Sequence, residues 1–166
     1  MSKKVLRAVA FISPENRPIL IRTFSNEDDH ASAIKYHYIA HTSLDVIEER
    51  VAAGGKSTEC YLGLLYAMED VAVYGYITPL KVKIVIALAL SDSVVRDVEI
   101  NLLCKALHMA YYSALSNPFL KLDAPTDATN DHSPYLLVGR SNWKNFRRRL
   151  DEISRVVSNP SNVSGT

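Results

Sequence analysis

The hydrophobic and polar positions change period along the chain, and each change marks a predicted element. Short runs of apolar residues predict five strands, and three segments with an apolar residue every three or four positions predict helices. The order is strand, strand, helix, three strands and two helices (ββαβββαα), with no internal repeat. The strands are expected at 5–12, 19–24, 60–68, 71–77 and 81–90, and the helices at 33–51, 94–116 and 141–157.

The connections between the predicted strands indicate how they pair. The segment 13–18 is dense in turn residues, as a hairpin loop should be, and the two short connections within 60–90 favour an antiparallel meander. Residues 81–90 end in a continuous apolar run, which is typical of a strand covered on both faces, so we place this strand centrally. We expect one α+β domain over 1–158, with the sheet between one helix and two, and a flexible tail over 159–166.

The first predicted helix has β-branched or apolar residues on the side that we expect to be exposed. Its buried face is predicted from spacings of four and three residues, which leaves Ile39, Thr42 and Val46 pointing away from it. Such residues favour a surface that a partner covers, although scattered surface hydrophobics are equally ordinary. The predicted buried face consists of Ala33, His37, Ala40, Leu44, Ile47 and Val51.

The two C-terminal helices are predicted to cover the other face of the sheet. Residues 91–93 (Ser-Asp-Ser) offer N-cap side chains for the second helix, and its polar band is so narrow that we expect it to pack against both the sheet and another helix. Ser141 is the expected cap of the third helix. The apolar face of this third helix consists of Trp143, Phe146, Leu150, Ile153 and Val157.

Three consecutive arginines, 147–149, lie on the third helix and could suggest contact with an acidic membrane or RNA. Asp151 stands four residues after the first arginine and Glu152 four after the second. Residues at this spacing are neighbours on a helix and can form ion pairs. We therefore expect a solvated, locally paired helix face.

Overall composition excludes several classes of protein. The 19 basic and 18 acidic side chains give a net charge of +1, so bulk charge does not favour nucleic acid as a partner. With 48% hydrophobic residues the chain can form a core, which excludes disorder over most of its length. Two cysteines exclude a disulfide framework, and neither a transmembrane run nor a signal-peptide core is present. We expect a cytoplasmic protein.

Motifs that would indicate an enzyme are weak. Residues 55–57 (Gly-Lys-Ser) resemble the end of a phosphate-binding loop, but Arg50 occupies the position of its first glycine, and the flanking elements are in the wrong order. His37, His41 and Asp45 could form a metal-binding ladder, yet they rotate away from one another, and a hydrogen-bonded pair of the last two is the simpler interpretation. We therefore predict no enzyme, no catalytic residue, no metal and no cofactor.

Four segments together resemble a known family. They are 41–46 (His-Thr-Ser-Leu-Asp-Val), 61–66 (Tyr-Leu-Gly-Leu-Leu-Tyr), 73–76 (Val-Tyr-Gly-Tyr) and 117–119 (Asn-Pro-Phe). In this order and at these separations they resemble the sedlin family of small subunits of the TRAPP complex, over about 5–120. The resemblance implies a longin (SNARE-like) fold with strand order 2-1-5-4-3.

The resemblance also implies a role without catalysis, in a complex that tethers vesicles between the endoplasmic reticulum and the Golgi and at the Golgi itself. That complex is an exchange factor for Rab-type GTPases, and its exchange activity lies in other subunits. The implied partners are small longin-type and Bet-type core subunits and a larger complex-specific subunit. Peripheral association with the membrane would come through the complex. The family's adaptor surface includes the aspartate that matches Asp45, which adds this residue to the candidate partner-binding set of Ile39, Thr42 and Val46.

Two other functions stay open at this point. One is a free-standing longin interaction module, such as a SNARE regulatory domain or a small adaptor-coat subunit, although no SNARE heptad segment follows the third helix. The other is an enzyme that uses His37, His41 and Asp45.

Overall fold

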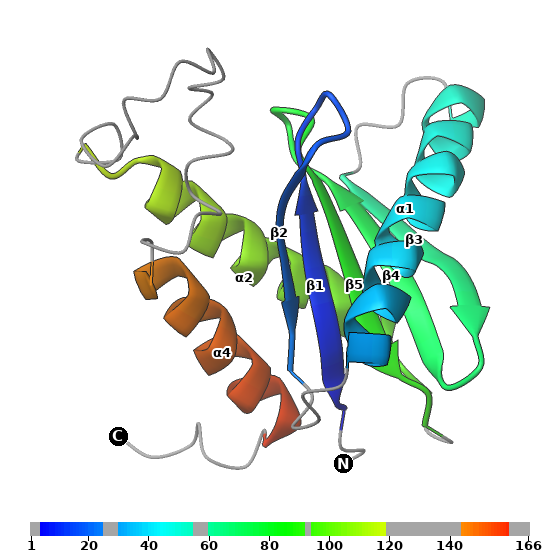
Figure 1. Ribbon diagram of the computed structural model, residues 1–166. Coiled ribbons are helices and arrows are strands. Elements are labelled where there is room, and N and C mark those ends of the chain that lie inside the picture. The colour runs from blue at the N-terminus through cyan, green and yellow to red at the C-terminus, as the bar shows by residue number, and fades with distance from the viewer. Residues whose placement is uncertain (1–3, 25–29, 55–59, 92–93, 119–143, 160–166) are drawn as a thin grey trace.

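The computed structural model describes residues 4–24, 30–54, 60–91, 94–118 and 144–159. Within these ranges the elements follow the predicted order and carry the labels of Figure 1. The strands are β1 (Leu6–Ile12), β2 (Pro18–Thr23), β3 (Tyr61–Met68), β4 (Val71–Ile77) and β5 (Lys83–Ala89), and the helices are α1 (His30–Ala53), α2 (Asp97–Leu115) and α4 (Lys144–Ser158).

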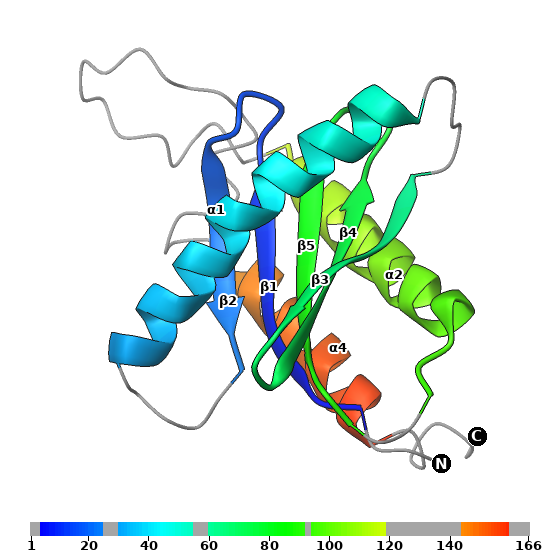
Figure 2. The ribbon, with the colours of Figure 1, turned by 90° about the vertical axis from the view of Figure 1, so that its right-hand side faces the viewer.

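The five strands form one antiparallel sheet of order β2-β1-β5-β4-β3. This confirms the order that the family resemblance implied and the central place predicted for the apolar strand β5. Helix α1 covers one face of the sheet, and α2 and α4 cover the other, as Figures 1 and 2 show from two sides. The predicted α+β architecture of a sheet between one helix and two is therefore confirmed.

Each face of the sheet has its own hydrophobic core. On the side of α2 and α4, the rings of Phe11, Tyr111 and Phe146 pack with centroids 5.3–6.0 Å apart. Phe146 and Leu150 of α4 are buried here, as their spacing predicted. On the α1 side, small residues of β1 such as Ala8 and Ala10 let the helix approach the sheet closely. The odd and even positions of the central strands thus supply two separate cores.

Helix α2 begins at Asp97, later than predicted. Arg96 occupies the N-cap position in an extended conformation without a side-chain cap, so residues 91–93 lie upstream of the helix. Asp97 and Glu99 place negative charge in the first turn, where it interacts favourably with the helix dipole. The expected cap at Ser141, the Trp143 side chain and the tail from 160 onward lie outside the described residues.

Asp151 of α4 has a partner on another element, which local spacing along the helix does not predict. This carboxylate accepts two hydrogen bonds, at 3.1 and 2.9 Å, from the guanidinium of Arg22 on β2. The two-bond geometry makes this pair stronger than a single-contact surface ion pair. It fastens α4 to β2 at the edge of the sheet.

Candidate interaction surface on helix α1

Helix α1 is seated on the sheet through a face rotated from the predicted one. Ala33, His37 and Val51, which were predicted to be buried, are exposed, while Tyr36 and Ser43 are buried. The rotation is about half a residue step, roughly 50° of the 100° that separates successive helical residues. The buried residues of the helix are Tyr36, Ile39, Ala40, Ser43, Leu44 and Ile47.

This rotation corrects the candidate partner-binding set. Ile39 is only 2% exposed and belongs to the core beneath the helix, so its prediction as a surface residue is wrong. Thr42 and Val46 are half-buried, and Val46 packs against the same core. Asp45 is exposed and keeps its place on the accessible side of α1.

Hydrogen bonds explain why a serine can lie beneath the helix. The Ser43 hydroxyl donates to the backbone carbonyl of Ile39, with an Oγ–O distance of 2.7 Å. The Tyr66 hydroxyl on β3 donates to the same carbonyl at 2.9 Å. Burial raises the pKa of Tyr66, so this hydroxyl keeps its proton for the bond. A buried polar group with a partner is tolerated, and the periodicity of apolar residues alone does not show this.

Polar contacts fix both ends of α1. The Lys35 ammonium contacts Asp70 at 2.9 Å and Glu69 at 3.3 Å in the β3–β4 turn. Its hydrogen bond to Asp70 raises the pKa of Lys35 and lowers the pKa of Asp70. Near the other end, Arg50 donates to the backbone carbonyl of Leu62 on β3. The helix is therefore held as a rigid element on which side chains can be presented.

The accessible side of α1 carries a continuous stripe with one acidic residue. Ile34 and Tyr38 are 70% and 62% exposed, and His41 and Asp45 follow at spacings of three and four residues. These spacings place all four on one side of the helix. We call Ile34, Tyr38, His41 and Asp45 the outer stripe.

Sequence reasoning missed Ile34 and Tyr38, although the same spacings, counted backward from Asp45, could have found them. In the outer stripe His41 and Asp45 are not hydrogen-bonded to each other, and Asp45 has no ion pair with any residue that the structure describes. Over the same residues no group of three metal-ligating side chains comes together, His37 included. The outer stripe thus combines exposed apolar area with an available carboxylate, which is suited to protein contact.

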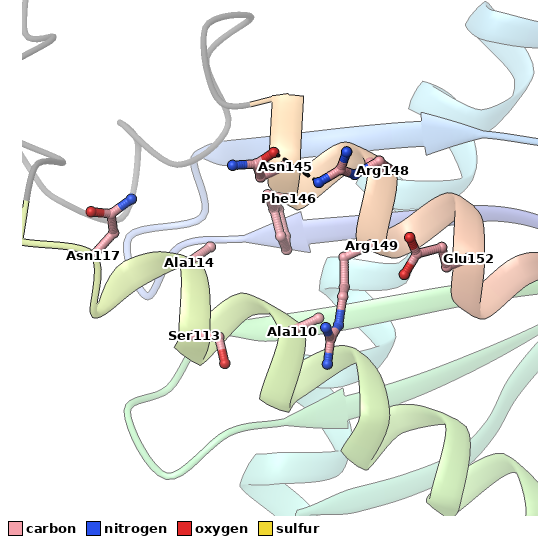
Figure 3. A pocket seen from close by; sticks show the side chains of 9 residues that line it. All are labelled: Ala110, Ser113, Ala114, Asn117, Asn145, Phe146, Arg148, Arg149 and Glu152. Atoms are coloured by element: carbon pink, nitrogen blue, oxygen red, sulfur yellow. Dashed lines mark hydrogen bonds between the residues drawn. The ribbon is translucent and has the colours of Figure 1, made fainter.

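A groove of about 270 Å³ lies on the other side of the sheet, between α2 and α4. Its floor includes the Phe146 ring, and the side chain of Arg149 extends across it toward α2, as Figure 3 shows. Arg148 donates to Asn145 at 3.2 Å on the rim. The lining residues are Ala110, Ser113, Ala114, Asn117, Asn145, Phe146, Arg148, Arg149 and Glu152.

The strand order and the division of helices between the two faces define a longin-like domain. Its described part contains no helix with the length and apolar character that a membrane crossing requires. The sequence comparison then gives the family. A family model described as Sedlin matches residues 11–133, and the chain belongs to the Sedlin family.

Named relatives agree with this assignment. The chain is 44% identical over 115 residues to proteins from Bos taurus and Mus musculus, both named trafficking protein particle complex subunit 2-like protein. These alignments cover 67% of this chain and 80% of each relative. A Dictyostelium discoideum protein of the same name is 37% identical over 127 residues, which cover 76% of this chain and 89% of that protein.

Proposed function

We propose that the protein is a non-catalytic subunit of the trafficking protein particle (TRAPP) complex and acts in vesicle transport through protein–protein contacts. The observation that carries the proposal is Sedlin family membership together with relatives named as subunits of that complex. The longin-like fold and the exposed outer stripe on α1 support a role in binding proteins. The proposal treats residues 1–158 as one domain.

The finer assignments follow from the same family. The partners are other TRAPP subunits, namely small longin-type and Bet-type core subunits and a larger complex-specific subunit. A Rab-type GTPase is reached only indirectly, through the complex. The protein acts at the cytoplasmic side of the Golgi and at the interface between the endoplasmic reticulum and the Golgi.

We assign the larger partner to the outer stripe of α1. Asp45 supplies an exposed carboxylate without an ion-pair partner in the described part of the chain, and Tyr38 supplies exposed aromatic area beside it. Aromatic side chains are enriched where protein interfaces bind most strongly. Thr42 and Val46 lie at the border of this surface as half-buried residues.

The test compares complexes purified through tagged wild type, Asp45→Tyr and Glu152→Tyr from cells in which each replaces the native chain. We expect Asp45→Tyr to remain folded and to lose the larger subunit, because the tyrosine removes the charge and adds bulk on the stripe. Glu152→Tyr is the matched control, since it exchanges an exposed helical carboxylate on the opposite side of the sheet. Equal subunit recovery with Asp45→Tyr and wild type would refute the assignment to the outer stripe.

A further inference from the structure

Helix α2 exposes apolar side chains along the side opposite its buried face. Val98, Leu102 and Met109 are 70%, 60% and 62% exposed, Tyr112 extends the same stripe, and Lys105 lies within it. The residues of α2 that face the core are Ile100, Leu103, Cys104, Leu107, Ala110 and Tyr111. A helix that is apolar on both sides has a second apolar surface to cover.

The neighbouring helix α4 presents positive charge on the same side of the molecule. Its exposed positions include Lys144, Arg148, Arg149 and Arg155, with Glu152 as the acidic residue among them. Helices α2 and α4 lie side by side on one face of the sheet (Figure 1), and residues of both line one groove, so we treat the apolar stripe and the cationic positions as one surface. We call this surface the α2–α4 face.

Apart from exposed Glu152, the acidic side chains near these cations have partners of their own. Asp151 is held by Arg22, as described above. Glu99 forms an ion pair with Lys4, and Asp97 accepts a hydrogen bond of 3.0 Å from the Tyr61 hydroxyl. With Lys105 of α2 included, the exposed cations of the α2–α4 face outnumber its exposed acidic side chains, Asp97, Glu99 and Glu152, so the face is positive although the chain as a whole carries only +1. An anionic surface complements it.

The groove between the two helices provides room where the apolar and cationic parts meet. Its volume of about 270 Å³ is lined by small side chains of α2, by the Phe146 ring and by Arg148 and Arg149. The side chain of Arg148 lies by Asn145 on the α4 wall of this groove, and that of Arg149 extends toward α2 (Figure 3). The phosphate headgroup of a lipid could enter this groove while the acyl chains of the same lipid lie beside the apolar stripe.

We propose that the α2–α4 face docks directly on an anionic lipid membrane. Amphipathic helices bind membranes by placing apolar side chains at the headgroup boundary while basic side chains contact anionic lipids, and the two helices divide these tasks between them. Tyr112 fits this arrangement, because tyrosine prefers the membrane–water interface. Two other kinds of partner fit the α2–α4 face less well. Protein-binding surfaces usually have few charges at their centre, whereas this face carries several. Surfaces that bind single-stranded nucleic acid interleave aromatic and basic residues, a pattern that this face does not have.

The proposal is independent of the function proposed for the outer stripe. The outer stripe and the α2–α4 face lie on opposite sides of the sheet (Figure 2). The chain could therefore hold a protein through α1 while it rests on a membrane through α2 and α4. Membrane contact would then be a property of this subunit itself.

The test is sedimentation of the purified full-length chain with phosphatidylcholine vesicles, with or without phosphatidylserine. We expect binding only when phosphatidylserine is present, and release at high salt because exposed charges are screened. Arg148→Gln/Arg149→Gln should lower the partition coefficient roughly 25-fold, since each cation near an anionic surface contributes about fivefold. Leu102→Ser/Met109→Ser should lower it by about tenfold.

Controls separate membrane binding from misfolding and from protein contacts. Ile34→Ser/Tyr38→Ser removes equivalent apolar area from the outer stripe and should leave vesicle binding unchanged, and circular dichroism should show every variant folded. The proposal is overturned if wild type does not sediment with phosphatidylserine vesicles, or if the Ile34/Tyr38 variant loses binding as strongly as the others. It is also overturned if light scattering shows that Leu102 and Met109 hold two copies of the chain together, because the stripe would then be a protein interface.

Discussion

Replacing Ile39 with alanine removes three carbon atoms from the core beneath α1. Ile39 is 2% exposed and packs among the small and β-branched residues of the sheet face that α1 covers. Of its neighbours along the helix, Tyr38 is exposed and Thr42 is half-buried. The substitution therefore distinguishes a core position from a surface position on the same helix.

The expected loss of stability follows from burial. Each buried methyl or methylene group contributes about 0.8 kcal/mol, so three give about 2.4 kcal/mol. The cavity left by partial relaxation raises the total to about 3–4 kcal/mol, within the range of about 2–5 kcal/mol for this type of change. For a domain of this size, that corresponds to a fall in Tm of roughly 6–16 °C.

The assay is urea unfolding of the full-length chain followed by circular dichroism, with two comparison variants. Ile39→Val, which removes one methyl group, should cost about 0.5–1.5 kcal/mol. Tyr38→Ala should change the free energy of unfolding by no more than about 0.5 kcal/mol, because its ring is exposed. A loss below about 1 kcal/mol for Ile39→Ala, or equal losses for Ile39→Ala and Tyr38→Ala, would show that the helix is not seated as described.

Two further predictions concern the other side of the sheet and the packing of its edge. A Cβ at Gly75 would lie 3.0–3.2 Å from the Leu65 side chain, so Gly75→Ala should lower stability by about 1–3 kcal/mol, and by less in a Leu65→Ala background. Burial lowers the pKa of His108 in the folded protein. As the pH falls below about 6.5, His108 is therefore protonated first in the unfolded chain, and the free energy of unfolding decreases. The decrease ends when His108 is also protonated in the folded protein. His108→Gln should reduce this pH dependence in chemical unfolding, and an unchanged pH dependence in that variant would contradict the reasoning.

Sequence patterns predicted the sheet better than the orientation of its helices. Strand β5 was placed at the centre because residues covered on both faces are uniformly apolar, a signal that belongs to the strand itself. The rotation of α1 depends on contacts that lie far away in sequence. The hydroxyls of Ser43 and Tyr66 share the Ile39 carbonyl, which allows a polar residue to be buried where periodicity expects an exposed one.

The candidate surfaces were predictable only in part for the same reason. Asp45 was found through the family motif, and it is exposed as a partner contact requires. Ile39 was assigned to the wrong side because the choice between it and Tyr38 rests on a rotation of about half a residue step. On α4, local spacing suggested Arg147 as the partner of Asp151, but Arg22 approaches from β2 only after the chain folds.

The central claim is that the chain works as a subunit of a TRAPP-type complex. The most direct measurement is gel filtration of the tagged wild-type protein purified from its own cells, with mass spectrometry of the proteins that co-elute. A subunit of such a complex should elute far above 18.5 kDa together with small longin-type and Bet-type subunits and a larger subunit. Elution near 18.5 kDa without such partners would contradict the role as a subunit of the complex, and only the longin-like fold would remain established.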